Sequence, residues 1–231
     1  MHQKRLSAPT SWPITRKTNV WVTRPSSGPN SKEKCIPLNI ALRDILGLGQ
    51  NTREIKHILN EGKVLVDGVI IKDHRFPIGI FSIVSIPSTK KYYRVLLDPK
   101  GRFILHPIKS SDTKLCKIKN KTTVKGGAVQ LNLHDGSNII ASNDYNTGDS
   151  VLLKMPQREI TKHLECKPGN LAMVIGGKHL GEIGLIKERK QVRSAKPNMV
   201  TIKGEKEFEV VADYIFVIGI DKPEIDLGVA K

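Results

Sequence analysis

The sequence is poor in the residues that mark disulfide-stabilised, zinc-binding and membrane proteins. It has three cysteines in 231 residues, at positions 35, 116 and 166, and none forms a C-x-x-C pair. A disulfide framework and a structural zinc site are therefore not expected. No apolar run approaches the ~18 residues of a membrane span. The first residues do not resemble a signal peptide, so we expect a soluble, cytoplasmic protein.

Sequence motifs of catalysis and cofactor binding are also missing. The chain contains no G-x-S-x-G, Walker A or G-x-G-x-x-G motif, and its seven histidines form no H-x-x-x-H pattern. Asp98, Asp135, Asp144 and Asp149 stand beside Gly, Pro or Asn, where turn chemistry alone places them. We expect no enzyme, no cofactor, no metal and no small-molecule substrate.

Aromatic residues are scarce as well, at 5% of the chain. The domain cores are therefore expected to consist of Val, Ile and Leu, as in many small β-barrels. A hydrophobic content of 39% and a charged content of 26% indicate a folded protein rather than a disordered one. A length of 231 residues allows two or three modest domains.

Positive charge is what the chain has in excess, with 38 Lys+Arg against 22 Asp+Glu and a net charge of +16. Residues 1–34 hold seven basic and one acidic residue (+6), and residues 35–88 hold six and five (+1). Residues 89–166 hold fourteen and seven (+7), and residues 167–231 hold eleven and nine (+2). No amphipathic basic helix suits a membrane surface. The phosphate backbone of a nucleic acid is the better partner.

Residues 1–34 predict an extended basic arm. Prolines at positions 9, 13, 25 and 29 exclude long helices and central strands. Both tryptophans of the chain, Trp12 and Trp21, lie here. We expect them to pack on the protein in preference to stacking on RNA bases. Phosphate contacts are predicted for the basic residues of the arm, which are Lys4, Arg5, Arg16, Lys17 and Arg24.

Residues 35–88 predict a helix–helix–hairpin unit. Pro37 opens a helix over residues 38–46, which ends at two nearby glycines. Asn51 and Glu54 form a capping-box pattern for a second helix over about residues 52–61. Asp67-Gly68 predicts a tight hairpin between two short strands, and a further strand is expected over residues 81–86.

The start of the second helix is a candidate phosphate site, because it presents free N–H groups and the positive end of the helix dipole. The residues predicted to surround it are Arg43, Thr52, Arg53, Lys56 and Lys63. An ordinary solvated helix face is an equally good interpretation, since the segment has a net charge of only +1.

Residues 89–166 predict a central antiparallel β domain, with a hairpin over residues 93–105 and strands over residues 129–133 and 151–154. A stretch with six lysines, residues 109–125, separates the hairpin from the next strand. Its candidate phosphate contacts are Lys114, Lys117, Lys119 and Lys121.

Residues 167–231 predict a small antiparallel barrel, because five short strands follow one another at even spacing over residues 172–218. The candidate RNA contacts in this part are Lys178, His179, Arg189, Lys190 and Arg193. Lys178 and His179 stand at an expected turn tip. The alternative for His179 is an exposed turn residue without a role.

Three stretches resemble known RNA-binding proteins. The two helices followed by Val64-Leu65-Val66-Asp67-Gly68 resemble the small domain of bacterial ribosomal protein S4, some pseudouridine synthases and some tRNA synthetases. Lys167-Pro168-Gly169 with the glycine-rich residues 173–184 is similar to the KOW motif, which begins an SH3-like barrel. The arm, at residues 2–9, 16–17 and 24–29, resembles the opening of the archaeal and eukaryotic small-subunit ribosomal protein family S4e.

The S4e resemblance implies the whole layout of the chain, because that family has the order basic arm, S4-type domain, central β domain and KOW barrel. The implied fold class is α+β and mostly β. The implied domains are an N-terminal extended arm (residues 1–34), a small helix-helix-hairpin S4-like domain (35–88), a central antiparallel β domain (89–166) and a C-terminal SH3-like (KOW) β-barrel with a tail (167–231). The chain length favours an archaeal-type member.

The function implied by this resemblance is structural. The protein would be a constituent of the small ribosomal subunit in the cytoplasm, with ribosomal RNA and neighbouring ribosomal proteins as partners. Two alternatives remain. A free RNA-binding regulatory factor would share the KOW barrel, and an RNA-modifying enzyme of the pseudouridine synthase type would share the S4-like domain.

Overall fold

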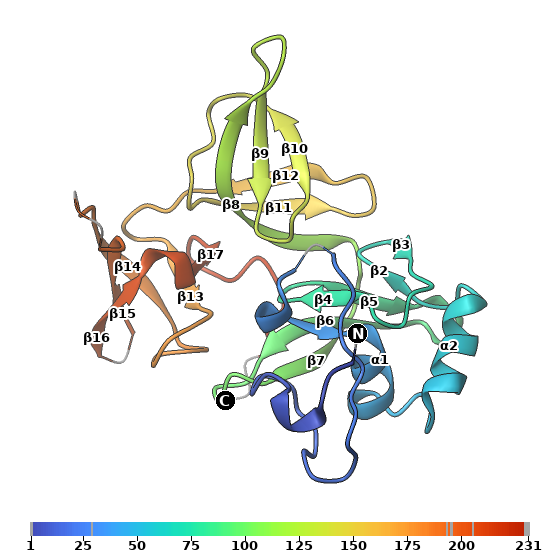
Figure 1. The fold of residues 1–231 in the computed structure, drawn as a ribbon. Coiled ribbons are helices and arrows are strands. Elements are labelled where there is room, and N and C mark those ends of the chain that lie inside the picture. The colour runs from blue at the N-terminus through green and yellow to red at the C-terminus, as the bar shows by residue number, and fades with distance from the viewer. Residues whose placement is uncertain (1, 29, 193, 195, 205, 229–231) are drawn as a thin grey trace. The chain divides into compact units, whose positions relative to one another are not determined.

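The computed structural model describes residues 2–28, 30–192, 194, 196–204 and 206–228. The chain divides into two compact units, one of residues 1–114 and 228–231 and the other of residues 115–227 (Figure 1). Antiparallel strands dominate both units and helices are few, which confirms the predicted mostly-β fold. Among the described residues, no helix is long and apolar enough to cross a membrane.

The first unit contains the helical part of the chain. Its helical segments are η1 (Arg5–Ser7), η2 (Lys32–Lys34), α1 (Leu38–Ile40), the π-helical turn η3 (Ala41–Ile45), α2 (Thr52–Asn60) and η4 (Pro87–Thr89). Its strands are β1 (Cys35–Pro37), β2 (Leu65–Val66), β3 (Val69–Ile70), β4 (Pro77–Gly79), β5 (Ile83–Ile86), β6 (Lys91–Leu97) and β7 (Phe103–Ile108).

Both predicted helices are present, but they begin and end in different ways. The first begins after Pro37 as α1 and continues as a π-helical turn, with Gly47 at a φ of 63° just beyond it. The second, α2, ends before Gly62, which has a φ of 71°. Asn51 is the N-cap residue of α2 as predicted, but its side chain caps no backbone N–H. Glu54 acts instead, since its Oε2 accepts from the backbone N–H of Gln50 at 2.8 Å.

The hairpin predicted at Asp67-Gly68 is confirmed. Both residues have positive φ, 50° and 76°, as a tight two-residue turn between β2 and β3 requires. Asp67 also accepts the backbone N–H of Ile83 at 2.8 Å, which ties the turn to the start of β5. The turn therefore fixes the register of the neighbouring strands.

The main sheet of the first unit has the order β3-β2-β5-β6-β7. The hairpin expected over residues 93–105 is observed as β6 and β7, but it extends this sheet and belongs to the first compact unit. The reason is that β5 leads through η4 directly into β6, and the two strands pair side by side, with Ile83 opposite Arg94. Strands β1 and β4 form a separate antiparallel pair.

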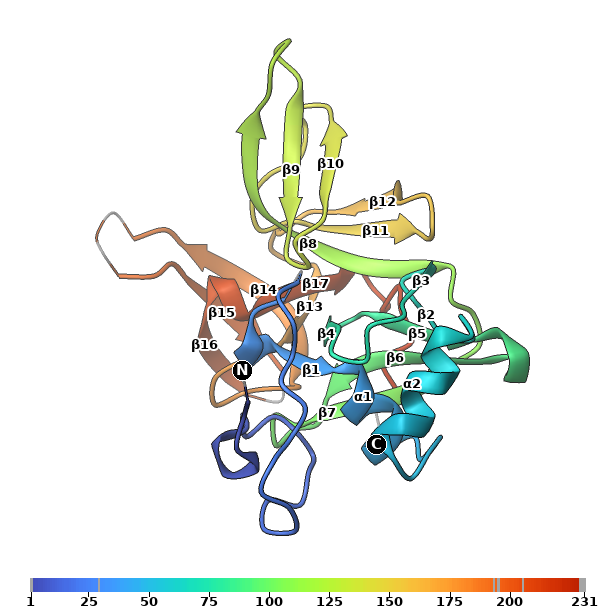
Figure 2. The same cartoon turned by 45° about the vertical axis from the view of Figure 1, so that its right-hand side comes forward.

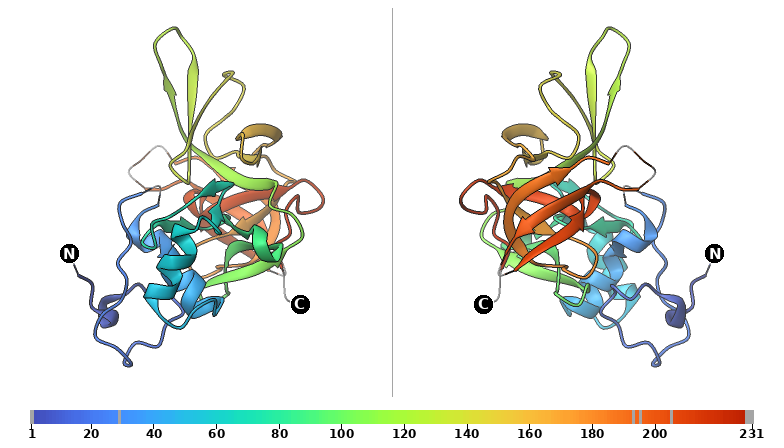
Figure 3. Two further views of the ribbon diagram at one scale, coloured as in Figure 1. Left: turned by 90° about the vertical axis from the view of Figure 1, so that its right-hand side faces the viewer. Right: turned by 90° about the vertical axis from the view of Figure 1, so that its left-hand side faces the viewer.

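The arm is folded onto the first unit rather than extended. Trp12 is 2% exposed and joins the core formed by residues of α1, α2 and the sheet. Its indole N–H donates to the carbonyl of Cys35 at 2.7 Å. The expectation that the tryptophans pack on the protein is therefore confirmed for Trp12. It was wrong for Trp21, which is 55% exposed. The arm, in dark blue, runs beside α1 and α2 in Figures 2 and 3.

The second unit contains two five-stranded antiparallel sheets. The first has the order β10-β9-β8-β11-β12 and is built from β8 (Thr113–Thr123), β9 (Val129–Leu133), β10 (Asn138–Ala141), β11 (Ser150–Lys154) and β12 (Glu159–Leu164). The lysine-rich stretch is thus mostly the long strand β8. Residues of β8, β9 and β11 form its core: Cys116, Ile118, Leu131, Leu133, Val151 and Leu153.

The other sheet has the order β16-β15-β14-β13-β17. Its elements are β13 (Leu171–Val174), β14 (Ile183–Lys190), β15 (Met199–Lys203), β16 (Glu207–Val211), η5 (Ala212–Tyr214) and β17 (Ile215–Gly219). Strands β16 and β17 are the two edges of this sheet. Gly184 allows β14 and β15 to approach closely, because a Cβ there would lie 2.6 Å from the side chain of Ile202.

Candidate nucleic-acid interface

A basic groove of about 1080 Å³ lies on the first unit between the arm and the helices. The arm contributes residues from His2 to Arg24, and the helical region contributes residues from Arg43 to Lys56. His74 and Arg75 complete the lining. These two reach the groove because the backbone N–H of Asn39, in α1, donates to the carbonyl of His74 at 2.8 Å.

The groove carries a net positive charge. Its lining includes five cationic side chains and a single carboxylate, that of Asp44. The five cations are Arg5, Arg24, Arg43, Lys56 and Arg75. Such a surface attracts a polyanion, and binding would release the counterions of the neutralised phosphates.

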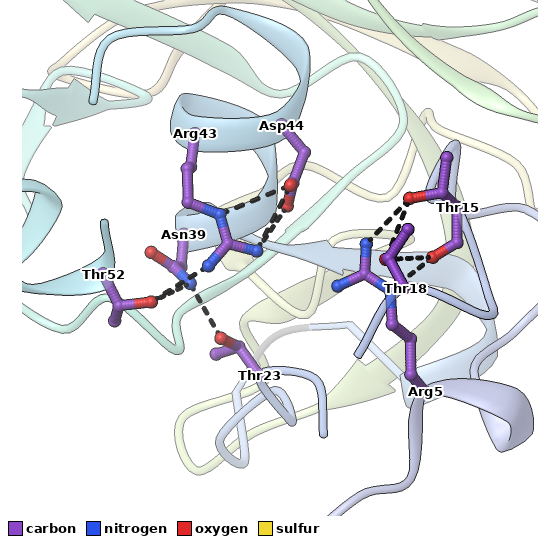
Figure 4. A network of polar contacts seen from close by, with 8 residues as sticks. All are labelled: Arg5, Thr15, Thr18, Thr23, Asn39, Arg43, Asp44 and Thr52. Carbon is purple, nitrogen blue, oxygen red and sulfur yellow. Dashed lines mark hydrogen bonds and ion pairs between the residues drawn. The ribbon is translucent and has the colours of Figure 1, made fainter. Parts of the chain in front are cut away.

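A polar network fixes Arg43 at the groove (Figure 4). Its Nη2 lies 2.8 Å from Asp44 Oδ2, and its Nη1 donates to Thr52 Oγ1 at 3.1 Å. The fully buried Asn39 donates to the same Thr52 hydroxyl at 3.3 Å and to Thr23 Oγ1 of the arm at 2.7 Å. The arm, α1 and the start of α2 are therefore held together at the place where the cations gather.

Two arm residues that were predicted to contact phosphate, Arg5 and Arg16, bind backbone carbonyls of the arm. Arg5 is 5% exposed, and its Nε donates to the carbonyl of Thr15. Arg16 donates to three backbone carbonyls, those of Leu6 at 3.1 Å and of Ala8 and Pro9 at 2.8 Å each. Arginine suits this task because its fork of donors can satisfy several acceptors at once.

The other predicted cations of the first unit are accessible. Lys4, Lys17, Arg53, Lys56 and Lys63 are exposed, and Arg24 is partly exposed. Lys56 and Arg24 line the groove, whereas Arg53 and Lys63 do not. Lys63 pairs with Glu61 at 2.6 Å, and this hydrogen bond lowers the pKa of the Glu61 carboxyl.

The fold disfavours protonation of His74, which lines the groove. Burial lowers its pKa below the ordinary 6.5, and the positive charges of Lys56 and Arg75 lower it further against the opposing effect of Asp73. Binding of a polyanion would offset the two positive charges. A polyanion bound in the groove would therefore raise the pKa of His74.

Two of the four predicted lysines of β8 do not face solvent. Lys114 is 2% exposed, and its Nζ lies 2.7 Å from Asp67 Oδ2. Lys117 is 8% exposed, and its Nζ donates to the carbonyls of Ala212, Asp213 and Ile215 at 2.8, 3.2 and 2.9 Å. The structure thus corrects the expectation of phosphate contacts here, because both ammonium groups are buried with protein partners.

The remaining two lysines of β8 lie farther along the strand. Lys119 is exposed. Lys121 is partly exposed and donates to the carbonyls of Asn143 and Tyr145 at 3.1 and 2.6 Å. Lys119 therefore remains accessible to a phosphate, whereas Lys121 already ties β8 to the loop after β10.

The predicted contacts of the last sheet are also mixed. Lys178 is exposed at the tip before His179. The His179 ring stacks on Phe208 with centroids 4.1 Å apart, and its Nδ1 lies 3.0 Å from Glu182 Oε1. Lys190 pairs with Glu209 at 2.5 Å, Arg189 is partly buried, and Arg193 lies outside the described residues.

Comparisons with known proteins identify the family. The sequence model described as "Ribosomal family S4e" matches residues 89–160, and the one described as "RS4NT (NUC023) domain" matches residues 1–33. The small ribosomal subunit protein eS4 of Archaeoglobus fulgidus is 52% identical over 233 residues, which cover 99% of each chain. The chain belongs to the ribosomal protein family S4e.

Other relatives agree with this S4e membership. The small ribosomal subunit protein eS4 of Methanocella arvoryzae is 52% identical over 225 residues, which cover 97% of this chain and 96% of the relative. The crystal structure of the 30S ribosomal protein S4e from Thermoplasma acidophilum is similar with a TM-score of 0.72 at 27% identity, over 82% of this chain and 97% of that one. The predicted family is confirmed, and this S4e protein is a ribosomal protein and not an enzyme.

Sequence reasoning missed part of the groove of this S4e protein. Its unpredicted lining includes His2, Gln3, Trp21, His74 and Arg75. His74 and Arg75 lie 14 and 15 residues after Asn60, the last residue of α2, and the hydrogen bond from Asn39 N–H to the His74 carbonyl brings them to the groove. The signal that could have revealed this wall of the groove was Trp21, because an indole in a proline-rich arm needs either a protein surface to pack against or a ligand that stacks on it.

Among the described residues of this S4e protein, Cys116, His134 and Asp135 form a group whose ligand atoms lie within 4.8 Å of one another. Cys116 Sγ donates to Asp135 Oδ2 at 3.7 Å, and His134 Nδ1 accepts the backbone N–H of Lys117 at 3.2 Å. The Cys116 and His134 atoms that could bind a metal therefore already form hydrogen bonds between β8 and the turn after β9. These hydrogen bonds give the group a structural role.

Proposed function

We propose that this S4e protein binds the RNA of the small ribosomal subunit through its arm and basic groove, and that this binding stabilises the RNA fold during subunit assembly. The observation that carries the proposal is the lining of the groove, with five cationic side chains against one carboxylate. A ribosomal protein needs such a surface, because ribosomal RNA helices repel one another through their phosphates.

The architecture supports a role in recognising RNA shape. Arg43 is held by Asp44 and Thr52, so its guanidinium meets a phosphate without first being ordered. Recognition through phosphates and positions of cations suits folded RNA, whose helices expose few base edges. Further phosphate contacts come from exposed cations outside the groove: Lys4, Lys17, Arg53, Lys119 and Lys178.

We assign roles to the other parts of the chain from their order in the sequence. Residues 35–88 act as the S4-type RNA-binding domain and residues 167–231 as the KOW domain. Neighbouring ribosomal proteins are further partners. The site of action is the small ribosomal subunit in the cytoplasm, which the names of the archaeal relatives support.

The test is the salt dependence of binding to small-subunit ribosomal RNA. In the variant Arg24→Gln/Lys56→Gln, two groove cations are removed, and the slope of log affinity against log salt should fall by about 2 if both meet phosphates. The control Lys91→Gln/Lys100→Gln removes the same charge from exposed positions outside the groove. Equal loss in both variants would show that only net charge matters and would contradict the proposed groove.

Sedimentation of a cell lysate distinguishes a structural ribosomal protein from a free RNA-binding factor. A structural ribosomal protein stays with small subunits after a high-salt wash, at about one copy for each subunit. A free factor washes into the soluble pool, because its binding depends mainly on phosphate contacts, which weaken as the salt concentration rises.

A further inference from the structure

We propose that the basic groove holds an unpaired nucleotide, whose base stacks on the indole of Trp21. This inference rests on the proposed RNA binding and specifies the kind of RNA. Trp21 lines the groove and is 55% exposed, whereas the other tryptophan is 2% exposed in the core. A large apolar ring left open to solvent inside a cationic groove is the arrangement with which proteins bind single-stranded nucleic acid.

The backbone that carries Trp21 is held in place before any ligand binds. Trp21 and Lys4 form an antiparallel β-bridge. On one side Arg5 N–H donates to the carbonyl of Val20 at 2.9 Å, and on the other Val22 N–H donates to the carbonyl of Gln3 at 3.1 Å. The ring of His2 lies beside the indole, with centroids 5.4 Å apart and a tilt of 52°. A stacked base therefore meets a positioned ring, which lowers the entropy cost of binding.

Gln3 provides a second, independent observation at the same place. It lines the groove and is 5% exposed, and neither polar atom of its side-chain amide has a hydrogen-bond partner among the described residues. Buried polar side chains in native proteins are nearly always hydrogen-bonded. Rotation of this side chain toward the groove would let its amide donate to and accept from a polar ligand, so ligand binding offers the partners that the free protein lacks.

The charges of the groove match such a ligand. Arg24, Arg43 and Lys56 line the same groove and can neutralise the phosphates that flank the stacked base. In an A-form duplex each base is stacked between its neighbours and paired, so an indole cannot reach a base face. The class of ligand is therefore an RNA segment with an unpaired base, such as a loop or a bulge, and not the side of a regular helix.

The experiment compares two RNA probes and three variants of the full chain. The probes are an oligoadenylate of about 12 nucleotides and a fully paired RNA duplex. Trp21→Leu keeps an apolar side chain without an aromatic face, and Trp21→Phe keeps a smaller face. Leu6→Ala is the matched control, since Leu6 is an exposed apolar residue of the arm outside the groove lining.

We expect oligoadenylate to quench the tryptophan fluorescence of the wild-type protein through Trp21, since Trp12 is shielded in the core. Trp21→Leu should lower the affinity for oligoadenylate about tenfold and Trp21→Phe by less, because stacking on each base contributes strongly to binding. Leu6→Ala should bind as the wild type does. The affinity for the duplex should be the same in all four proteins.

Two outcomes would overturn the inference: unchanged oligoadenylate affinity in Trp21→Leu, or an equal loss for oligoadenylate and duplex. Either can occur while the variant Arg24→Gln/Lys56→Gln still lowers the salt slope on ribosomal RNA. In that case RNA binding by the groove stands and only the stacking is refuted. An unchanged salt slope in that variant refutes the proposed function instead.

Discussion

The ammonium group of Lys114 lies 2.7 Å from the Asp67 carboxylate, and Lys114 is 2% exposed. The pair joins the start of β8 to the β2–β3 turn, across 47 residues of sequence. Asp67 also holds the N–H of Ile83, so one carboxylate connects the turn, β5 and β8. A buried ion pair is strongly destabilised when either of its charges is removed, because the other charge stays buried without compensation.

Lys114→Ala is therefore expected to lower the free energy of unfolding by about 3 kcal/mol, because it leaves the Asp67 carboxylate partly buried without its cation. Urea unfolding measures this loss. The double variant Lys114→Met/Asp67→Asn should recover most of it, since the introduced amide would retain an acceptor for the N–H of Ile83 without a charge. A loss of RNA affinity with unchanged stability would contradict this structural role.

Lys117→Met should destabilise the second unit by about 2 kcal/mol or more, because three carbonyls lose a charged donor. Lys119→Met is the matched control, two residues away on the same strand and exposed. It should leave the unfolding free energy within about 0.5 kcal/mol of the wild type. Similar unfolding midpoints for the two variants would refute the assigned difference between these lysines.

Gln3→Leu is expected to stabilise the free protein by about 1 kcal/mol, because it removes a buried amide without partners and keeps the apolar contacts. Thermal unfolding in the absence of RNA measures the change. A lower melting temperature for this variant would mean that the amide has a partner in the free protein. In the presence of oligoadenylate the variant should gain less stability than the wild type.

The depressed pKa of His74 predicts how stability depends on pH. The unfolded chain binds a proton at this residue near pH 6.5, and the folded chain does so only at lower pH, owing to burial and then to Lys56 and Arg75. Stability should therefore be unaffected by this residue above pH 6.5 and fall as the pH drops below it. His74→Gln should show a shallower fall in the urea midpoint. An unchanged pH slope in this variant would contradict the assignment.

Local features of the fold were predictable from the sequence. The Asp67-Gly68 turn and the end of α2 at Gly62 depend on positive φ, which the identity of a few consecutive residues signals directly. The π-helical turn after α1 was not predicted, nor was the lack of a side-chain cap from Asn51 at the start of α2. Their geometry depends on packing between the helices and on which of two nearby acceptors is better placed.

The candidate site was only partly predictable, because long-range contacts decide whether a lysine is buried. The carbonyls that bind the Lys117 ammonium group lie 95 or more residues away, and no local pattern distinguishes Lys117 from the exposed Lys119. Arg43, Thr52 and Lys56 were predicted and do line the groove. The other wall, formed by the arm, could not be inferred, since it depends on Trp12 entering the core and on the bond from Asn39 to Thr23.

The docking of the arm sets an order of events during synthesis of the chain. The carbonyl of Ser11 accepts the backbone N–H of Phe103, and Ser26 N–H donates to the carbonyl of Arg75. The arm is made before both of these partners, so it completes its contacts only after β7 has emerged from the translating ribosome. Until then the arm has only its internal contacts, such as those of Arg5 and Arg16, and its exposed cations Lys4 and Lys17 are open to any polyanion nearby.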